Sequence, residues 1–379
     1  MDRDELSAWL RLVLTPRIGP GTARQLLAAL ASPQAIFEAS QTTLLGIVSP
    51  RDAKALSCPP EGLDAQLEQT WAWLHAQSAA TVGSRALLTL ADSRYPSSLF
   101  QTADPPLMLF AQGRLDLLSH PAVAVVGSRS PTAQGKDNAF AFSKALSLAG
   151  VTVVSGLAQG VDGAAHDGAL EALSADAQAG STIAVVGTGL DRVYPRAHLA
   201  LAHRIAQQGL MLSEFLLGTP PLPGNFPKRN RIVAGLTKGT LVVEAAVQSG
   251  SLITARLAGE MGREVLAIPG SIHAPQSRGC HALIKQGAKL VETAQDVLDE
   301  LRLDRVAVIP ASADGGRDQA DTSGDPVLSV MGFDPVSQEA LSARTGMGPA
   351  ELGAKLLELE LTGLVARLPG QLFQRMNQA

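Results

Sequence analysis

Cysteine, aromatic residues and long apolar runs are all scarce in this chain of 379 residues. Its two cysteines, Cys58 and Cys280, are too few for a disulfide framework or a zinc cluster, and they suit a reducing compartment. No stretch approaches the roughly eighteen apolar residues of a membrane helix. The acidic start MDRDELSAWL is unlike a secretory signal. We therefore expect a cytoplasmic protein that does not contact the membrane.

Common catalytic motifs are missing as well. The chain contains no HExxH, GxSxG or Walker A lysine motif, which argues against a zinc protease, an α/β-hydrolase and a P-loop nucleotidase. Asp162 and His166 have the i, i+4 spacing of one helix face, but such a pair more often forms a structural hydrogen bond. The sequence GCH at 279–281 offers one thiol and one imidazole, too few for a metal site. We expect no catalytic residue, no metal and no cofactor.

The balance of charge is slightly acidic, with 31 Lys and Arg against 35 Asp and Glu and a net charge of −4. This net charge argues against a protein whose whole surface is basic. It does not exclude a local basic groove, because the potential that an anion meets is set nearby and is screened within about 10 Å.

The chain divides into segments of different composition. Residues 1–60 predict short helices, in which the turn IGPG at 18–21 resembles either a helix-hairpin-helix or a plain helical hairpin. Residues 82–300 alternate short apolar strands with helices, which is typical of an α/β fold with a parallel sheet covered on both faces. Residues 310–326 are rich in Gly, Asp and Ser and predict a flexible linker. Residues 327–379 predict a winged-helix domain.

The winged-helix prediction depends on the order of elements in residues 337–375. A helix, a glycine turn and a second helix precede two short strands around Pro369 and Gly370. Cations and glutamates occur there in similar numbers, so the composition leaves duplex DNA binding and a packing role both open. The cations are Arg344, Lys355, Arg367 and Arg375.

The turn after the apolar strand at 124–126 departs from a dinucleotide-binding turn. Gly127 is placed as in that turn, but Arg129 and Thr132 stand where the GxGxxG fingerprint has its other glycines. Ligands of parallel sheets gather at the carboxyl ends of the strands. Gly127, Ser128 and Arg129 are therefore candidates for phosphate contacts, and the alternative for Arg129 is to cap a helix or pair with an acid.

A second candidate lies between residues 216 and 243, where the chain contains no acid but several basic residues, Lys238 among them. Cations for phosphates, an aromatic face for a base and an amide for a base edge suit a single-stranded nucleic acid. The alternative is that the aromatic ring lies in the core and the cations form a solvated face. The candidate residues are Phe226, Lys228, Arg229, Asn230 and Arg231.

A third candidate follows the next strand, where Ser249, Gly250, Ser251 and Thr254 lie at the predicted start of a helix. Backbone N–H groups and the helix dipole favour a phosphate at such a position. The same hydroxyl groups would equally serve as N-caps.

Several long motifs in the central segment resemble, in order, those of the DNA-processing protein A family (DprA, also called Smf). The resemblance spans about residues 90–300, and it is looser for the N-terminal segment, which looks like the family's SAM-like helical domain, and for the C-terminal segment, which looks like its winged helix. The motifs are VAVVGSR, SGLAQGVDGAAHDGAL, VVGTGLDRVYPRAH, SEFLLGTPPLPGNFPKRNRIVAGL, VVEAAVQSGSLITARLAGEMGREVLAIPGS and SRGCHALIKQGA.

The resemblance implies an extended Rossmann domain that binds single-stranded DNA without catalysing a reaction. It also implies a homodimer and the loading of a RecA-type recombinase onto incoming strands in natural transformation and recombination. By matched position, Arg129 is the phosphate-binding arginine and FPKRNR supplies the rest of a basic pocket, while GCHALIKQGAKLV at 279–291 falls at the dimer surface. If about four to five phosphates are neutralised, log K should fall with log[salt] at a slope of about −3.

The alternative is an enzyme, because the same fold resembles the nucleotide-processing "lonely guy" group with its PGGxGTxxE segment. Gly239, Thr240 and Glu244 of that pattern remain, but the Pro-Gly-Gly approach is replaced by Gly-Leu-Thr at 235–237. This replacement removes the tight backbone loop around a ribose phosphate. We therefore favour binding over catalysis.

Overall fold

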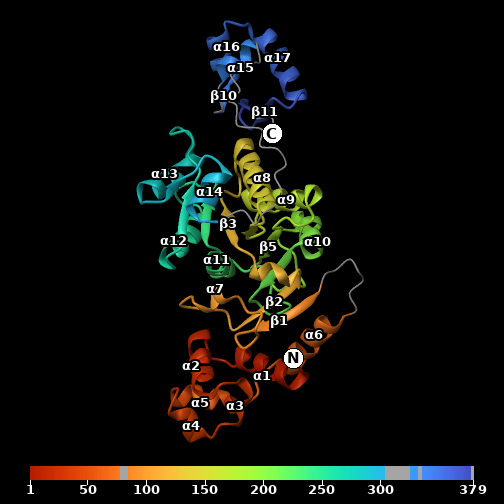
Figure 1. The fold of residues 1–379 in the computed structure, drawn as a ribbon, viewed down its shortest axis with the longest axis vertical. Coiled ribbons are helices and arrows are strands. Elements are labelled where there is room, and N and C mark those ends of the chain that lie inside the picture. The colour runs from red at the N-terminus through yellow and green to blue at the C-terminus, as the bar shows by residue number, and fades with distance from the viewer. Residues whose placement is uncertain (77–83, 304–324, 332–334, 377–379) are drawn as a thin grey trace. The chain divides into compact units, whose positions relative to one another are not determined.

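The computed structural model describes residues 1–76, 84–303, 325–331 and 335–376 (Figure 1). It contains two compact units, which we call the first unit (Met1–Ser119 and Ile183–Leu236) and the second unit (His120–Thr182 and Thr237–Ala379). Almost all of the predicted linker at 310–326 lies outside the described residues. Among the helices of the described ranges, none has the length and apolar character needed to cross a membrane.

The first unit begins with the short helices that the sequence predicts. Ser32, Ser40 and Ser49 each start a helix by accepting a hydrogen bond from a backbone N–H of its first turn. The apolar faces of these helices share one core with Leu87 and Phe110 of the strands that follow. The helices are α1 (Arg3–Leu14), α2 (Pro20–Leu30), α3 (Pro33–Glu38), α4 (Gln41–Leu45), α5 (Pro50–Leu56) and α6 (Leu63–His75).

The strands of the first unit run in the order β1-β2-β6-β5. β5 and β6 are parallel, but β2 is antiparallel to both β1 and β6, so this edge of the predicted parallel sheet is antiparallel. The strands are β1 (Arg85–Thr89), β2 (Met108–Gly113), β5 (Thr182–Val185) and β6 (Leu210–Ser213). The accompanying helices are α7 (Ser97–Phe100), α10 (Leu199–Gln208) and α11 (Asn225–Leu236), with 3-10 turns at Leu115–Ser119 and Arg196–His198.

The strands of the second unit are all parallel, in the order β4-β3-β7-β8-β9. Their carboxyl ends therefore lie along one edge, and the α/β class with a mostly parallel sheet is confirmed. The strands are β3 (Ala122–Val126), β4 (Thr152–Ser155), β7 (Gly239–Val242), β8 (Glu264–Ala267) and β9 (Lys289–Leu290). The helices are α8 (Ala133–Leu148), α9 (Val161–Ala175), α12 (Ser251–Glu260), α13 (Arg278–Lys285) and α14 (Ala294–Glu300), with a 3-10 turn at Pro275–Ser277.

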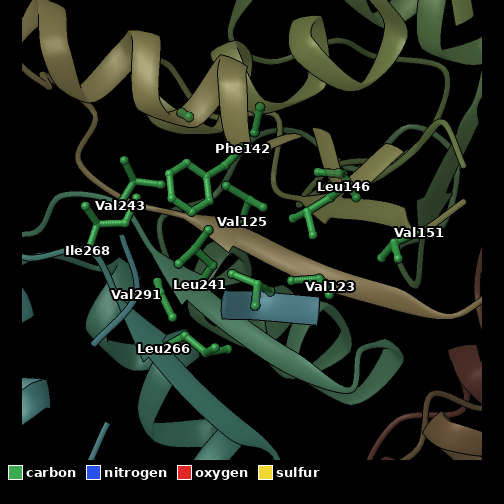
Figure 2. Packing of buried hydrophobic residues seen from close by; sticks show 14 of the residues in the cluster. Val123, Val125, Phe142, Leu146, Val151, Leu241, Val243, Leu266, Ile268 and Val291 are labelled. Carbon is green, nitrogen blue, oxygen red and sulfur yellow. The ribbon is translucent and has the colours of Figure 1, made fainter. Parts of the chain in front are cut away.

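One face of this parallel sheet is covered by a continuous apolar core (Figure 2). Alternate residues of β3, Val123 and Val125, point to the same side as Leu241 of β7. Phe142 and Leu146 of α8 pack onto them. The alternation along each strand thus fixes which residues face the helices, and it leaves the loops at the carboxyl edge to carry polar groups.

The C-terminal segment has the order of a winged helix, as predicted. Gly346 ends the first helix of the pair with a φ of +73°, and a two-stranded wing follows the second helix. Leu341, Leu352 and Phe373 belong to its own apolar core. The elements are α15 (Pro326–Met331), β10 (Val336–Ser337), α16 (Gln338–Thr345), α17 (Pro349–Leu361), β11 (Val365–Leu368) and β12 (Leu372–Arg375).

Candidate nucleic-acid interface

The turn after β3 passes so close to its neighbours that only glycine fits at its start. A Cβ on Gly127 would lie 2.7 Å from Val161 Cγ2 and 2.9 Å from the carbonyl oxygen of Glu244. Ser128 N donates a hydrogen bond of 2.7 Å to that same carbonyl, and Val161 N donates one of 3.1 Å to the Ser128 carbonyl. The exposed Arg129 therefore follows a backbone that is fixed on both sides.

The carboxylate of Glu244 occupies the start of α8. Thr132 N and Thr132 Oγ1 donate to its two oxygens at 3.0 and 2.6 Å, and Thr132 Oγ1 also accepts the N–H of Gly135 at 3.0 Å. A Cβ on Gly135 would lie 2.4 Å from Glu244 Cδ. A helix start at this place binds the phosphate in dinucleotide-binding folds. Here an internal carboxylate takes that place, which gives a physical reason for Thr132 where the fingerprint has glycine.

The start of α12 lies at the same sheet edge as Arg129. Val126 of β3 is paired with Val242 of β7, so the loops that follow these two strands leave the sheet side by side. In the second loop, the hydroxyl groups of Ser249 and Ser251 are 2.7 Å apart, and Ser251 is buried, as is Thr254. The structure thus brings the first candidate, at 127–129, and the third, at 249–254, to one edge of the second unit.

The basic cluster lies in the first unit, at the start of α11. Lys228 and Arg229 are adjacent in the helix and therefore point in different directions. Lys228 is exposed, whereas Arg229 is only 4% exposed. The guanidinium of Arg229 donates to the carbonyl of Val185, and its Nε donates to Asn230 Oδ1 at 3.2 Å. Arg229 therefore ties α11 to the end of β5.

Arg231 also has partners within the protein. It forms an ion pair with Glu214, and both side chains are 15% exposed. Arg231 Nε lies 3.2 Å from an oxygen of Asp104, which also pairs with Arg24 at 2.7 Å. Burial raises the pKa of Glu214, and the charge of Arg231 opposes that rise. This network joins α2, the segment before β2, the end of β6 and α11.

An aromatic pair involves Phe226, which lies two residues before Lys228 in α11. The rings of Phe226 and Tyr194 have centroids 5.5 Å apart, Phe226 is half-buried, and Tyr194 is 47% exposed. Phe226 lies against Gly187, where a Cβ would be 3.1 Å from its ring. Tyr194 was not among the site residues predicted from the sequence. The available signal was a tyrosine, one of only two in the chain, in a loop that follows a predicted strand.

One basic residue of the acid-free stretch lies away from these candidates. Lys238 is exposed immediately before β7, and its N–H donates to the carbonyl of Ala122 at 2.9 Å. Lys238 is therefore at the amino edge of the second unit's sheet, whereas Arg129 follows the carboxyl end of β3.

The remaining titratable groups that the sequence analysis considered have structural partners. Asp162 accepts the N–H groups of Gly156 and Ala158 at 3.1 and 3.3 Å, and His166 Nδ1 lies 2.7 Å from Thr182 Oγ1. Burial raises the pKa of Cys280 to about 11, which keeps the thiol protonated at neutral pH. Within the described ranges, no three His, Cys, Asp or Glu side chains gather as metal ligands.

Comparison with known families identifies two matching regions. Residues 86–302 match the family of DNA recombination-mediator protein A, and residues 311–371 match the DprA winged helix domain. Protein Smf of Escherichia coli K12 is 38% identical over 369 residues, which cover 96% of this chain and 94% of that protein. DNA processing protein DprA of Streptococcus pneumoniae is 49% identical over 212 residues, with coverage of 56% and 73%.

Solved structures of DprA proteins resemble the chain. The crystal structure of Streptococcus pneumoniae DprA has a TM-score of 0.64 and 37% identity, and the match covers 79% of this chain and 98% of that one. DNA processing protein A of Helicobacter pylori, described for its single-stranded DNA binding mode, has a TM-score of 0.51 and 31% identity, with coverage of 57% and 95%.

Proposed function

Because the chain belongs to the DprA/Smf family of DNA processing proteins, we propose that it binds and protects single-stranded DNA and delivers it to a RecA-type recombinase in natural transformation and recombination. The observation that carries the proposal is the first turn of α11, which contains the exposed Lys228 and, two residues before it, Phe226, whose ring contacts that of Tyr194. An aromatic face beside a cation accepts any base and its phosphate, as non-specific strand binding requires.

Different residues of the candidate set take different roles in this proposal. Arg129 and Lys228, both exposed, contact phosphates, and Phe226 and Tyr194 stack on bases. Gly127, Ser128 and the loop from Ser249 to Thr254 form the carboxyl edge beside Arg129 over which the strand passes. Arg229, Asn230 and Arg231 hold α11 in place through their internal partners.

We propose that this function involves no catalysis. Glu244 is the acid that remains from the nucleotide-processing motif, and its carboxylate accepts hydrogen bonds from the backbone and hydroxyl of Thr132. These hydrogen bonds occupy both oxygens of the carboxylate. It holds the β3–α8 loop, which is a structural role.

We also propose that the chain forms a homodimer through residues 279–291. This stretch includes α13 and β9, and β9 is the last strand in the order of the second unit's sheet. Leu290 of β9 is exposed, and a groove of 490 Å³ lies between α12 and α13. An edge strand with an exposed apolar residue beside a groove suits a self-complementary surface.

Replacing Arg129 or Lys228 with alanine is expected to weaken binding to an oligothymidylate about tenfold each, because each change removes a charge-assisted phosphate contact. Lys238→Ala is the matched control, since Lys238 is also exposed but lies at the amino edge of β7. Fluorescence anisotropy measures affinity, and circular dichroism melting checks the fold. An equal loss in Lys238→Ala would show that only overall charge matters.

The salt dependence of binding is expected to be weaker than the sequence alone predicts. Arg229 and Arg231 are largely buried and held by internal contacts, whereas Arg129 and Lys228 are the exposed cations of the candidate set. Two phosphates give a slope of about −1.4 in log K against log[salt], or roughly a sevenfold loss between 50 and 200 mM salt. A titration over that range checks this. A slope near −3 would mean that both arginines leave their partners, and a slope near zero would contradict phosphate binding.

A further inference from the structure

Helix α17 of the winged helix has two apolar faces. Leu352, Leu356 and Leu359 are buried in the core of the winged helix. A second row contains Leu357, which is 56% exposed, and Leu361, which is 81% exposed. We call this row the outer stripe of α17; it comprises Ala350, Ala354, Leu357 and Leu361, all exposed.

The spacing of the outer stripe is regular. Its members follow one another at intervals of four, three and four residues. With 3.6 residues per turn, these positions fall within about 60° of one another around the helix. The same spacing forms the seam between two helices in a coiled coil. Single exposed leucines are common on protein surfaces, but an aligned row over the length of a helix is suited to pack against another helix.

Acidic residues border the outer stripe on both sides. By the helical period, Glu351 and Glu358 lie on one side and Glu360 on the other. The nearby cation, Lys355, is paired with Glu358 at 2.9 Å and with Asp325 at 3.1 Å. The border of the stripe is therefore negative.

This charge pattern argues against duplex DNA as the occupant. The second helix of a helix-turn-helix motif enters the major groove and meets phosphates at its borders. Here those borders are acidic, and Arg344 and Arg375 donate to the carbonyls of Val330 and Leu328 within the winged helix. A second copy of α17 is also disfavoured, because its acidic borders would face the same acids. A helix with basic borders has the complementary charge.

We propose that the outer stripe of α17 binds an amphipathic helix of a partner protein, with an apolar row bordered by Lys and Arg. The apolar rows of the two helices would interdigitate, as in other helix-to-helix recognition. The glutamates that border the outer stripe would form ion pairs with the Lys and Arg of the partner helix. The winged helix would then serve as a protein-docking module of this DNA-binding chain.

The test uses the full chain and two dye-labelled helical peptides of about three heptads. Both peptides carry leucine at the seam positions, with lysine borders in one and glutamate borders in the other. Fluorescence anisotropy is expected to show at least about tenfold tighter binding of the lysine-bordered peptide. The double variant Leu357→Ser/Leu361→Ser should lose that binding at least about tenfold. Ile272→Ser, which removes an exposed apolar residue outside α17, should retain it.

A charge-reversal variant tests the borders separately. Glu358→Lys/Glu360→Lys should prefer the glutamate-bordered peptide, and affinity for single-stranded DNA should stay at the wild-type value in every variant. Equal binding of both peptides, or of wild type and the leucine variant, would overturn the proposal. Loss of binding to a duplex oligonucleotide in the leucine variant would also overturn the proposal, because the stripe would then be a DNA-binding surface. If the leucine variant sedimented as a monomer where wild type sediments as a dimer, the stripe would bind a second copy of the chain instead. If the variant unfolded at a lower temperature and wild type did not bind the peptide, the stripe would pack on its own chain.

Discussion

Arg231→Ala is expected to lower the free energy of unfolding by about 3–5 kcal/mol, because it leaves the largely buried carboxylate of Glu214 without its cation. Removing one partner of a buried ion pair costs more than the pair contributes, since the remaining charge stays desolvated. Urea unfolding of wild type and variant at pH 8 measures the difference. The double variant Arg231→Ala/Glu214→Gln should recover much of the loss, because it removes the unpaired charge.

The loss in Arg231→Ala is also expected to depend on pH. Burial already raises the pKa of Glu214 in the folded protein, so the folded state binds this proton more readily than the unfolded state does. Stability from such a group is present at low pH and is lost as pH rises through the folded pKa. Removing Arg231 raises that pKa further, so the variant should be closer to wild type at pH 5 than at pH 8.

Arg24→Ala is the matched control for this network. Arg24 pairs with Asp104, whose side chain is about half exposed, so its removal should cost no more than about 1 kcal/mol. A loss in Arg24→Ala as large as that in Arg231→Ala would show that burial of the acid is not the decisive factor. A loss in Arg231→Ala that is the same at both pH values would exclude Glu214 as its source.

Gly160→Ala is expected to lower the free energy of unfolding by about 2–4 kcal/mol and to weaken single-stranded DNA binding roughly tenfold. Gly160 has a φ of +82°, and a Cβ there would lie 2.4 Å from the carbonyl oxygen of Ser128 and 2.7 Å from that of Arg129. The substitution therefore strains its own backbone and also displaces the loop that carries Arg129. Thermal unfolding and anisotropy report the two effects.

Gly250→Ala provides the comparison. Gly250 precedes α12 as Gly160 precedes α9, but it has a φ of −61° and no atom within 4 Å of an added Cβ. Its unfolding free energy should stay within about 0.5 kcal/mol of wild type. If Gly160→Ala is equally harmless, the close contact with the Arg129 loop does not constrain that loop.

The sequence predicts the second unit well because its central strands β3, β4 and β7 are buried along their whole length. Strands such as β3 and β4 are short, β-branched and followed by glycine or polar residues, so their positions can be recognised without tertiary information. β2 was not predicted because its sequence MLFAQG contains no β-branched residue, and it pairs antiparallel with β1 and with β6, which is distant in the sequence. A parallel pattern of alternating strand and helix gives no sign of such an edge.

The candidate site was harder to predict because the position of each residue around the helix axis decides which cation is exposed. Lys228 and Arg229 are adjacent in the sequence, yet one is exposed and the other bonds to Val185. α11 itself was not identified, since prolines precede it and Pro227 is its third residue. Proline is tolerated there because the first N–H groups of a helix have no intrahelical partner. The role of Glu244 depends on a contact with Thr132, 112 positions away, that no local pattern encodes.

The carboxylate of Glu244 at the start of α8 has a consequence for competition with small metabolites. A free mononucleotide that approached this helix would have to displace an anion tethered to the same chain, and a tethered group acts at a high effective concentration. The helix start is therefore closed to the nucleotide pool of the cell. If the chain binds single-stranded DNA as proposed, a strand held by several separate contacts would not depend on this one position, so we expect the same feature to exclude free nucleotides without weakening strand binding.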